Sequence, residues 1–153
     1  MATVYTLTRE QWLPKPVELV FEFFSRPENL QSITPPWLDF RIVEAPPNLS
    51  MGSLIHYSLR WRLVPLRWTT EITVWDPPRH FVDTQISGPY VLWEHEHRFV
   101  PDANGTRMYD NVRYSLPFGF LGTLTHRAWV QSDLDKIFDF RRAKMEQLLG
   151  ERL

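Results

Sequence analysis

The sequence predicts an α+β domain in which a curved antiparallel sheet wraps around a long C-terminal helix. Two observations carry this prediction. Six strand-like segments separated by turn signals follow one another between residues 39 and 116, and one long amphipathic segment occupies residues 123–149. Strands followed by a single helix lack the alternating helices of a parallel sheet, so we expect antiparallel pairing with the helix across one face.

The N-terminal part adds a seventh strand and two short helices. Residues 3–12 have the composition of a strand. Pro16 precedes a short amphipathic helix over residues 17–25, because proline is tolerated in the first turn of a helix. A second short helix is predicted from Pro27 to Ile33, where the break at Pro35-Pro36-Trp37 follows.

Turn residues and periodicity delimit the later elements. The six strands are predicted at residues 39–45, 53–63, 66–75, 79–87, 91–100 and 106–116. Between the last two, Asp102-Ala-Asn104-Gly105 predicts a hairpin in which Asn-Gly supplies the positive φ angles of the turn. The last helix has apolar residues at a 3.6-residue period, followed by Gly150 as its stop. These apolar residues are Val130, Leu134, Ile137, Phe138, Met145 and Leu148.

Composition limits the classes of protein that remain. A chain of 153 residues predicts a single domain over residues 1–153 with a core of adequate size. The chain has no cysteine, so neither disulfides nor thiolate sites are expected. A net charge of −1 without a basic stripe argues against nucleic-acid binding. No apolar run reaches the roughly 18 residues of a membrane span, and the N-terminus lacks a signal-peptide pattern, so we expect a cytoplasmic protein.

Aromatic residues are unusually frequent, with ten Phe, seven Trp and five Tyr. Wide aromatic side chains fill cores, and they also line ligand cavities in which a few polar groups set the orientation. A strongly curved sheet and one helix seldom close perfectly against each other. We therefore expect a cavity between them.

Strand alternation predicts which side chains face the helix. The inward residues are Ile55, Tyr57, Leu59, Trp61 and Leu63 on one strand; Trp68, Thr70, Ile72 and Val74 on the next; Trp93, His95, His97 and Phe99; and Met108, Asp110, Val112, Tyr114 and Leu116. The segment 79–87 has polar and apolar residues on both faces, so its inward face stays undecided.

Three ionisable residues, His95, His97 and Asp110, fall on this apolar face. His97 lies directly opposite Asp110 if the hairpin loop spans residues 102–105, or one diagonal step away if the turn is Asn-Gly. The pair either satisfies itself beneath the helix or orients a ligand. His95-x-His97 places two imidazoles on one strand face, as in some zinc sites, but a third ligand is not convincingly placed and no metal is expected.

The remaining candidates are less distinctive. Arg141 lies on the apolar stripe of the last helix, where it either pairs with an acidic residue or captures an anionic group of a ligand. The predicted ligand-binding residues are Tyr57, Trp61, Trp68, Trp93, His95, His97, Asp110, Tyr114, Phe138 and Arg141. A nucleophile elbow and a Gly-rich phosphate loop are both missing from the sequence, which argues against nucleophilic catalysis.

Several short runs together resemble one superfamily over essentially the whole chain. They are Val20-Phe-Glu-Phe-Phe-Ser25, Pro27-Glu-Asn-Leu30, Thr34-Pro-Pro-Trp-Leu38, Pro65-Leu-Arg-Trp68, Trp75-Asp-Pro-Pro78, Phe81-Val-Asp83, Gly88-Pro-Tyr90, Trp93-x-His95-x-His97-x-Phe99 and Tyr114-x-Leu-Pro-Phe-Gly119. With the order of elements, they resemble the START-like (SRPBCC) superfamily, in particular its bacterial ligand-binding, cyclase/dehydrase-type members. The resemblance implies a helix-grip fold with a deep cavity between the sheet and the last helix.

Three functions are compatible with this resemblance. The first is binding of a small hydrophobic ligand, whether lipid-like, polyketide-like or aromatic, without a cofactor. The second is a polyketide cyclase or dehydratase, a lyase or isomerase in which Asp110 holds His97 as the acid-base group. The third is a structural or regulatory domain with a vestigial cavity. The oligomeric state is open, and a homodimer through the polar sheet face or an edge strand is one arrangement.

Overall fold

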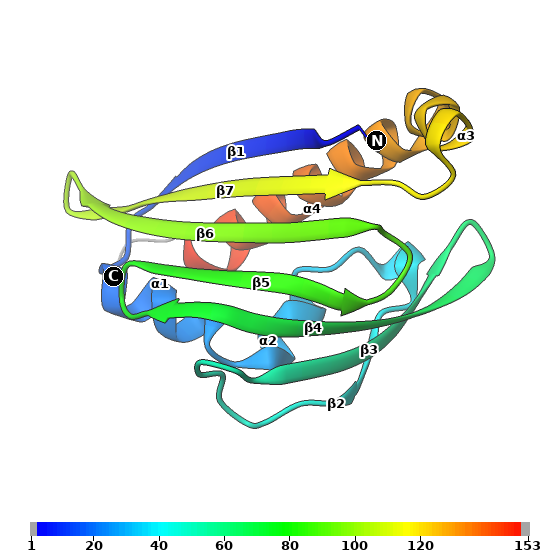
Figure 1. The fold of residues 1–153 in the computed structure, drawn as a ribbon. Helices are drawn as coiled ribbons and strands as arrows, with labels where there is room; N and C mark the ends of the chain where they lie inside the picture. The colour runs from blue at the N-terminus through cyan, green and yellow to red at the C-terminus, as the bar shows by residue number, and fades with distance from the viewer. Residues whose placement is uncertain (1–2, 151–153) are drawn as a thin grey trace.

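A computed structural model of the protein describes residues 3–150, in which seven strands form one antiparallel sheet (Figure 1). The strands are β1 (Tyr5–Leu13), β2 (Arg41–Glu44), β3 (Leu54–Trp61), β4 (Val64–Asp76), β5 (His80–Ser87), β6 (Leu92–Asp102) and β7 (Gly105–Ser115). Their order in the sheet is β1-β7-β6-β5-β4-β3-β2, so the first strand of the chain pairs with the last. The predicted sheet is confirmed.

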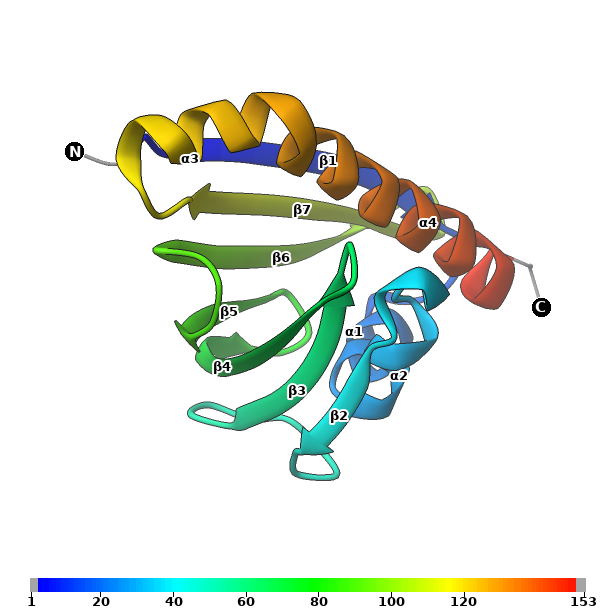
Figure 2. The same ribbon diagram turned by 90° about the vertical axis from the view of Figure 1, so that its right-hand side faces the viewer.

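The helices lie on the concave side of this sheet (Figure 2). They are α1 (Val17–Phe24), α2 (Pro27–Ser32), the 3₁₀ helix η1 (Pro36–Leu38), α3 (Gly119–Thr125), the π-helical segment η2 (His126–Val130) and α4 (Gln131–Leu149). The last three run on without a break and cross β1 and β7. The long helix around which the sheet curls is confirmed, and it begins four residues before the predicted start.

The buried stripe of α4 differs from the prediction at its C-terminal end. Leu149 is buried, whereas Leu148, which we expected in the stripe, is 44% exposed. Leu149 lies four residues after the buried Met145 and therefore one turn further along the same face. The buried residues of α4 are Leu134, Phe138, Arg141, Met145 and Leu149.

The hairpin between β6 and β7 fixes the register on which the site depends. Its turn consists of Ala103 and Asn104, with φ angles of 48° and 63°, so the expectation that Asn-Gly supplies these angles is wrong by one residue. Gly105 is required for space instead, because a Cβ atom there would lie 2.3 Å from the backbone oxygen of Leu13. The resulting register pairs His97 directly with Asp110.

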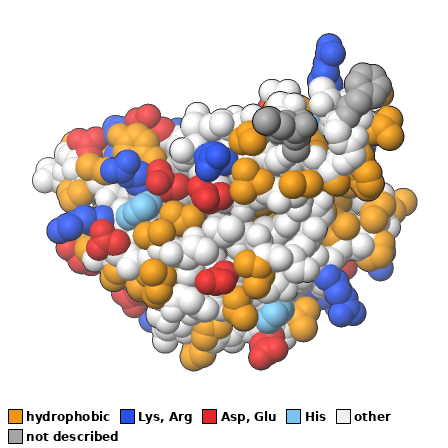
Figure 3. Space-filling view, viewed as in Figure 1, with side chains coloured by type: hydrophobic (Ala, Val, Ile, Leu, Met, Phe, Trp, Pro, Cys, Tyr) orange, Lys and Arg blue, Asp and Glu red, His pale blue; other side chains and the backbone are white. Residues whose placement is uncertain are grey.

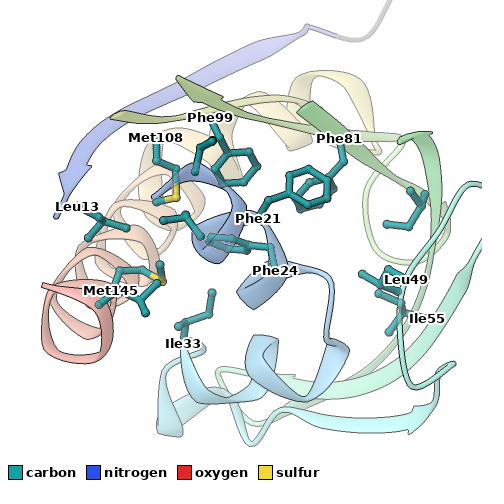
Figure 4. Close-up of a cluster of buried hydrophobic side chains, with 14 residues drawn as sticks. Leu13, Phe21, Phe24, Ile33, Leu49, Ile55, Phe81, Phe99, Met108 and Met145 are labelled. Carbon is teal, nitrogen blue, oxygen red and sulfur yellow. The ribbon is translucent and has the colours of Figure 1, made fainter. Parts of the chain in front are cut away.

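The hydrophobic core has an aromatic centre. Phe21 and Phe24 of α1 point toward Phe81 and Phe99 of the sheet (Figure 4). The rings of both α1 residues lie 5.5 Å from the ring of Phe99, within the range of favourable aromatic pairs. A second group of buried residues packs the start of α4 against β7. Each group therefore fastens one end of the helical layer to the sheet.

The surface mixes charges of both signs with hydrophobic side chains (Figure 3). Hydrophobic side chains gather at the right-hand end, where Figure 1 places α3 and the turn between β3 and β4. Leu63 of the turn, Leu121 of α3 and Phe118, which precedes α3, are exposed. Within residues 3–150, none of the helices has the length and hydrophobicity of a membrane span.

Candidate functional site

A cavity of about 400 Å³ lies between the sheet and the helical layer. It borders both core groups, since Phe24 and Phe81 of the first and Leu134 and Phe138 of the second line it. Its volume lies in the range of small-molecule sites, roughly 300–1,000 Å³. The interior is therefore large enough to hold a ligand.

The structure places most of the predicted ligand-binding residues on this cavity. Those that line it are Tyr57, Trp61, Trp68, Trp93, His95, His97, Phe138 and Arg141. Asp110 and Tyr114 are buried but do not line the cavity. The Tyr114 hydroxyl instead lies 2.8 Å from Nε2 of His126 in η2, and burial raises the pKa of Tyr114 to about 12.

A polar cluster connects the sheet with helix α4. It consists of Asp83 of β5, His95 and His97 of β6, Asp110 of β7 and Arg141 of α4, which we call the Asp83–Arg141 cluster. The two carboxylates lie on either side of the imidazoles. His97 Nε2 is 2.6 Å from Asp83 Oδ2, His95 Nε2 is 2.8 Å from Asp110 Oδ1, and Arg141 Nη2 is 3.1 Å from Asp110 Oδ1.

The partners of each imidazole indicate where its proton lies. Arg141 Nη2 can only donate, and it lies 3.4 Å from Nδ1 of His97, so Nδ1 accepts and Nε2–H donates to Asp83. His95 donates from Nε2 to Asp110, and its Nδ1 lies 3.9 Å from Asp83 Oδ2. The rings of Phe81, His97 and His95 stack with centroids 4.0 and 3.7 Å apart, and this column fixes their planes.

Burial and neighbouring charges shift the pKa values of the cluster residues, and for the two carboxyl groups these effects oppose each other. Burial lowers the pKa of His97 well below its ordinary value, and His95 and Arg141 lower it further, so the imidazole is neutral. Burial raises the pKa of Asp83 against the opposing effect of His95. Burial alone would raise the pKa of Asp110, but Arg141 and the hydrogen bond from His95 outweigh it and lower that pKa.

The pairing within the cluster differs from the expected His97–Asp110 pair. Although these two residues are direct partners in the register, His97 Nδ1 is 3.5 Å from Asp110 Oδ1, whereas its Nε2 makes the shorter contact with Asp83. Both imidazoles therefore hydrogen-bond to diagonal rather than direct neighbours on the adjacent strands. Strand alternation left Asp83 undecided, because residues 79–87 are mixed on both faces, although its neighbour Phe81 is buried.

Two further features were not foreseen. Asp133 of α4 accepts hydrogen bonds from Nε1 of Trp61 at 2.6 Å and from two nitrogens of Arg62, each at 3.0 Å. In addition, three buried polar atoms of cavity-lining residues have no hydrogen-bond partner within the described part of the chain. They are Nε1 of Trp68, Oγ1 of Thr70 and Nε of Arg141.

Comparison with known proteins identifies the family. Residues 13–137 match the sequence pattern of a family described as polyketide cyclase/dehydrase and lipid transport. The chain belongs to this family. No curated protein matches the sequence closely enough to be counted as a relative. The family supports a role in binding a hydrophobic ligand.

Several solved structures share the fold. A protein of Thermus thermophilus is 20% identical, with a TM-score of 0.70 over 94% of this chain and 95% of that one. A Mycobacterium smegmatis protein is 17% identical, with a TM-score of 0.69 over 97% and 98%. Major latex-like protein 151 of Panax ginseng is 10% identical, with a TM-score of 0.70 over 97% and 99%. At these identities the likeness shows the helix-grip fold alone.

Proposed function

We propose that the protein binds a small hydrophobic molecule with a polar or anionic end in the cavity between the sheet and the C-terminal helix. The observation that carries this proposal is the combination of a 400 Å³ cavity with aromatic walls and a buried cation, Arg141, on its lining. Apolar area removed from water contributes about 25 cal/mol per Å². The aromatic walls would therefore supply affinity, and Arg141 with His97 would fix the orientation.

The unpartnered donors on the lining support a ligand that carries oxygen atoms. Nε1–H of Trp68 and Nε–H of Arg141 can only donate, and a buried donor without a partner costs about 1–3 kcal/mol. A carbonyl, carboxylate or phenol oxygen would accept from them. Lipid-like, polyketide-like and aromatic compounds with such oxygens all fit this description.

The first test uses purified protein. Denaturing extraction followed by mass spectrometry should release a hydrophobic compound with at least one oxygen function. In parallel, the protein should bind 8-anilinonaphthalene-1-sulfonate, an aromatic probe with an anionic end, at one site per chain. A protein that releases no compound and does not bind this probe saturably would contradict the proposal.

A pair of variants on one strand then localises the probe. Thr70 is buried and lines the cavity, whereas its neighbour Thr69 faces the other side of the sheet. Thr70→Met should fill part of the cavity and weaken probe binding at least tenfold without lowering the unfolding temperature. Thr69→Met should leave the affinity unchanged. Equal effects of both variants would place the probe elsewhere.

A second candidate is a cyclase or dehydratase activity, favoured by the neutral His97 on the cavity wall. Asp83 accepts from its Nε2–H at 2.6 Å and orients the ring, which leaves the lone pair of Nδ1, 3.4 Å from Arg141 Nη2, as the candidate base. With the extracted compound as substrate, His97→Ala should abolish turnover while largely preserving affinity. Loss of both in proportion would leave binding as the function.

A further inference from the structure

The Asp83–Arg141 cluster contains three metal-ligating side chains that converge on the cavity. One nitrogen each of His95 and His97 and one oxygen of Asp83 lie within 4.8 Å of one another. His95 and His97 share a face because they are two residues apart on β6, and Asp83 of β5 is the direct register partner of His95. We propose that Asp83, His95 and His97 bind a divalent transition-metal ion of the zinc type, a function beyond the proposed binding of a hydrophobic ligand and independent of it.

The donor set and the distances suit such an ion. Two imidazoles and one carboxylate are ligands that Zn²⁺, Co²⁺, Ni²⁺ and Fe²⁺ accept. Zinc bonds of about 2.0–2.2 Å place tetrahedral ligand atoms roughly 3.3 Å apart. Asp83 Oδ2 is now 2.6 Å from His97 Nε2 and 3.9 Å from His95 Nδ1, so the required spacing lies between the two. Small side-chain rotations reach it.

The surrounding groups orient both imidazoles toward an ion. Because His95 donates its Nε2–H to Asp110, the lone pair of Nδ1 points to the side of Asp83. For His97, binding through Nε2 moves the proton to Nδ1, which then gives up its 3.4 Å contact with Arg141 Nη2 and has Oδ1 of Asp110 3.5 Å away as an acceptor. Metal-bound histidines usually donate their second nitrogen to such a carboxylate. Asp110, held by Arg141, thus supports both ligands.

Charge balance favours a cation at this place. The cluster holds the side chains of Asp83 and Asp110 against the single guanidinium of Arg141. Uncompensated buried charge is unfavourable, and a cation between Asp83 and the imidazoles neutralises the carboxylate that Arg141 does not contact. Since all three ligands line the cavity, the remaining coordination positions face it, as in open rather than structural zinc sites.

The test is titration of chelator-treated protein with Co²⁺, followed by visible absorption, and with Zn²⁺, followed by calorimetry. We expect one ion per chain and absorption bands typical of Co²⁺ bound with low coordination number. Asp83→Asn and His95→Gln should each weaken binding more than tenfold, and Asp110→Asn about 10–100-fold as a supporting residue. His80→Gln is the matched control, because His80 pairs with Glu96 at 3.1 Å outside the cluster. This variant should bind the metal ion as tightly as the unsubstituted protein.

A measurement on the unsubstituted protein keeps the proposal testable if the variants do not fold. In the unsubstituted protein, Co²⁺ should shift or broaden the amide NMR signals around residues 83 and 95–97 before any others. No saturable binding up to 1 mM, or binding that persists in Asp83→Asn and His95→Gln, or broadening centred elsewhere, would overturn the proposal. Titration with the anilinonaphthalene probe in the presence of chelator tests the hydrophobic site separately, so the two proposals fail independently.

Discussion

Arg141 reaches from helix α4 to the sheet and stabilises the negative charge of Asp110. Its guanidinium carbon lies 5.1 Å from the ring centroid of Phe24 and 5.7 Å from that of Phe138, so it is enclosed by aromatic rings as well as by the cluster. Both partners of the Arg141–Asp110 pair are buried. Removing either one leaves a buried charge without compensation, which is the unfavourable situation for an ion pair.

This arrangement predicts a strongly coupled pair of substitutions. Arg141→Met should lower the free energy of unfolding by about 3–5 kcal/mol, because Asp110 is left uncompensated. Adding Asp110→Asn to that variant should restore part of the loss. The double variant should therefore be more stable than expected from adding the effects of the two single substitutions. Urea unfolding of the four proteins measures the coupling. Additive effects would contradict the pairing.

His126 predicts a pH dependence of stability. It is buried beside Tyr114 and stacks on Tyr5 with centroids 3.5 Å apart, and burial lowers its pKa below the ordinary value. The unfolded chain therefore binds a proton more readily than the folded one. The contribution of His126 is complete above about pH 6.5 and is lost as the pH falls from there toward its folded pKa, with a slope of at most about 1.4 kcal/mol per pH unit.

The measurement is the urea midpoint of the protein and of His126→Gln between pH 7.5 and pH 5. The variant is expected to be less stable at pH 7.5, because Tyr114 loses its partner, and to lose less stability on acidification. An unchanged slope in His126→Gln would show that other groups carry the pH dependence.

Single residues also show how far the sequence predicts the site. Alternation along β6 and β7 was sufficient to place His95, His97 and Asp110 between the sheet and the helix, because their strands separate polar from apolar residues cleanly. Asp83 could not be placed in the same way, since β5 has polar and apolar residues on both faces. Its role depends on which strand lies beside β6, and that is a property of the sheet rather than of the local sequence.

At the scale of elements, the turn between β3 and β4 is tied to helix α4. Asp133 accepts from Trp61 and Arg62 at the end of the hairpin, and the side chain of Asp133 also lines the cavity. Hydrogen bonds to a charged group contribute about 1.5–3 kcal/mol. This contact therefore adds a polar link between the hairpin and the helix at one end of the cavity.

Asp133→Ala should release the hairpin. Amide hydrogen exchange should accelerate in residues 60–65 and in the first turn of α4, and remain unchanged in β6 and β7. Asp135→Ala is the matched control, because Asp135 pairs instead with Arg9 of β1 at 2.8 Å. Equal acceleration of the hairpin in both variants would contradict a specific role of Asp133.

The elements themselves were predicted well, with two instructive exceptions. Periodicity identified the long helix but not the π-helical segment His126–Val130, since one widened turn leaves the apolar spacing almost unchanged. Likewise, Asn104-Gly105 predicted a hairpin but not its register. The close approach of Gly105 to β1 decides the register, and β1 is distant in the sequence.

At the scale of the whole molecule, the cavity lies between the two layers and is bordered by both. Its existence followed from the curved sheet and single helix, but its volume depends on how every side chain along the interface packs, which the sequence does not state. A ligand in this position contacts the sheet and the helical layer at once. Occupancy should therefore stabilise the fold as a unit.

The anilinonaphthalene probe provides a test of this coupling. At a free concentration of 100 times its Kd, it should raise the free energy of unfolding by about 2.7 kcal/mol, provided that the unfolded chain does not bind it. Differential scanning calorimetry should show the rise in one cooperative transition. In Thr70→Met, the same concentration should give a much smaller rise, and an equal rise there would indicate binding outside the cavity.

The two ends of the cavity differ in their exposure to solvent. Phe118 contributes to it and is 78% exposed, so the cavity reaches the surface beside α3, whereas Arg141 and His97 are buried. A ligand that enters by this opening and binds Arg141 with its anionic end enters with that end first and gives up its hydration among aromatic rings. The rate of entry is then proportional to the concentration of the protonated, uncharged ligand. The residence time is set by the charged form, because only that form pairs with Arg141. A weak acid would load fastest in a mildly acidic medium and be retained longest in a neutral one.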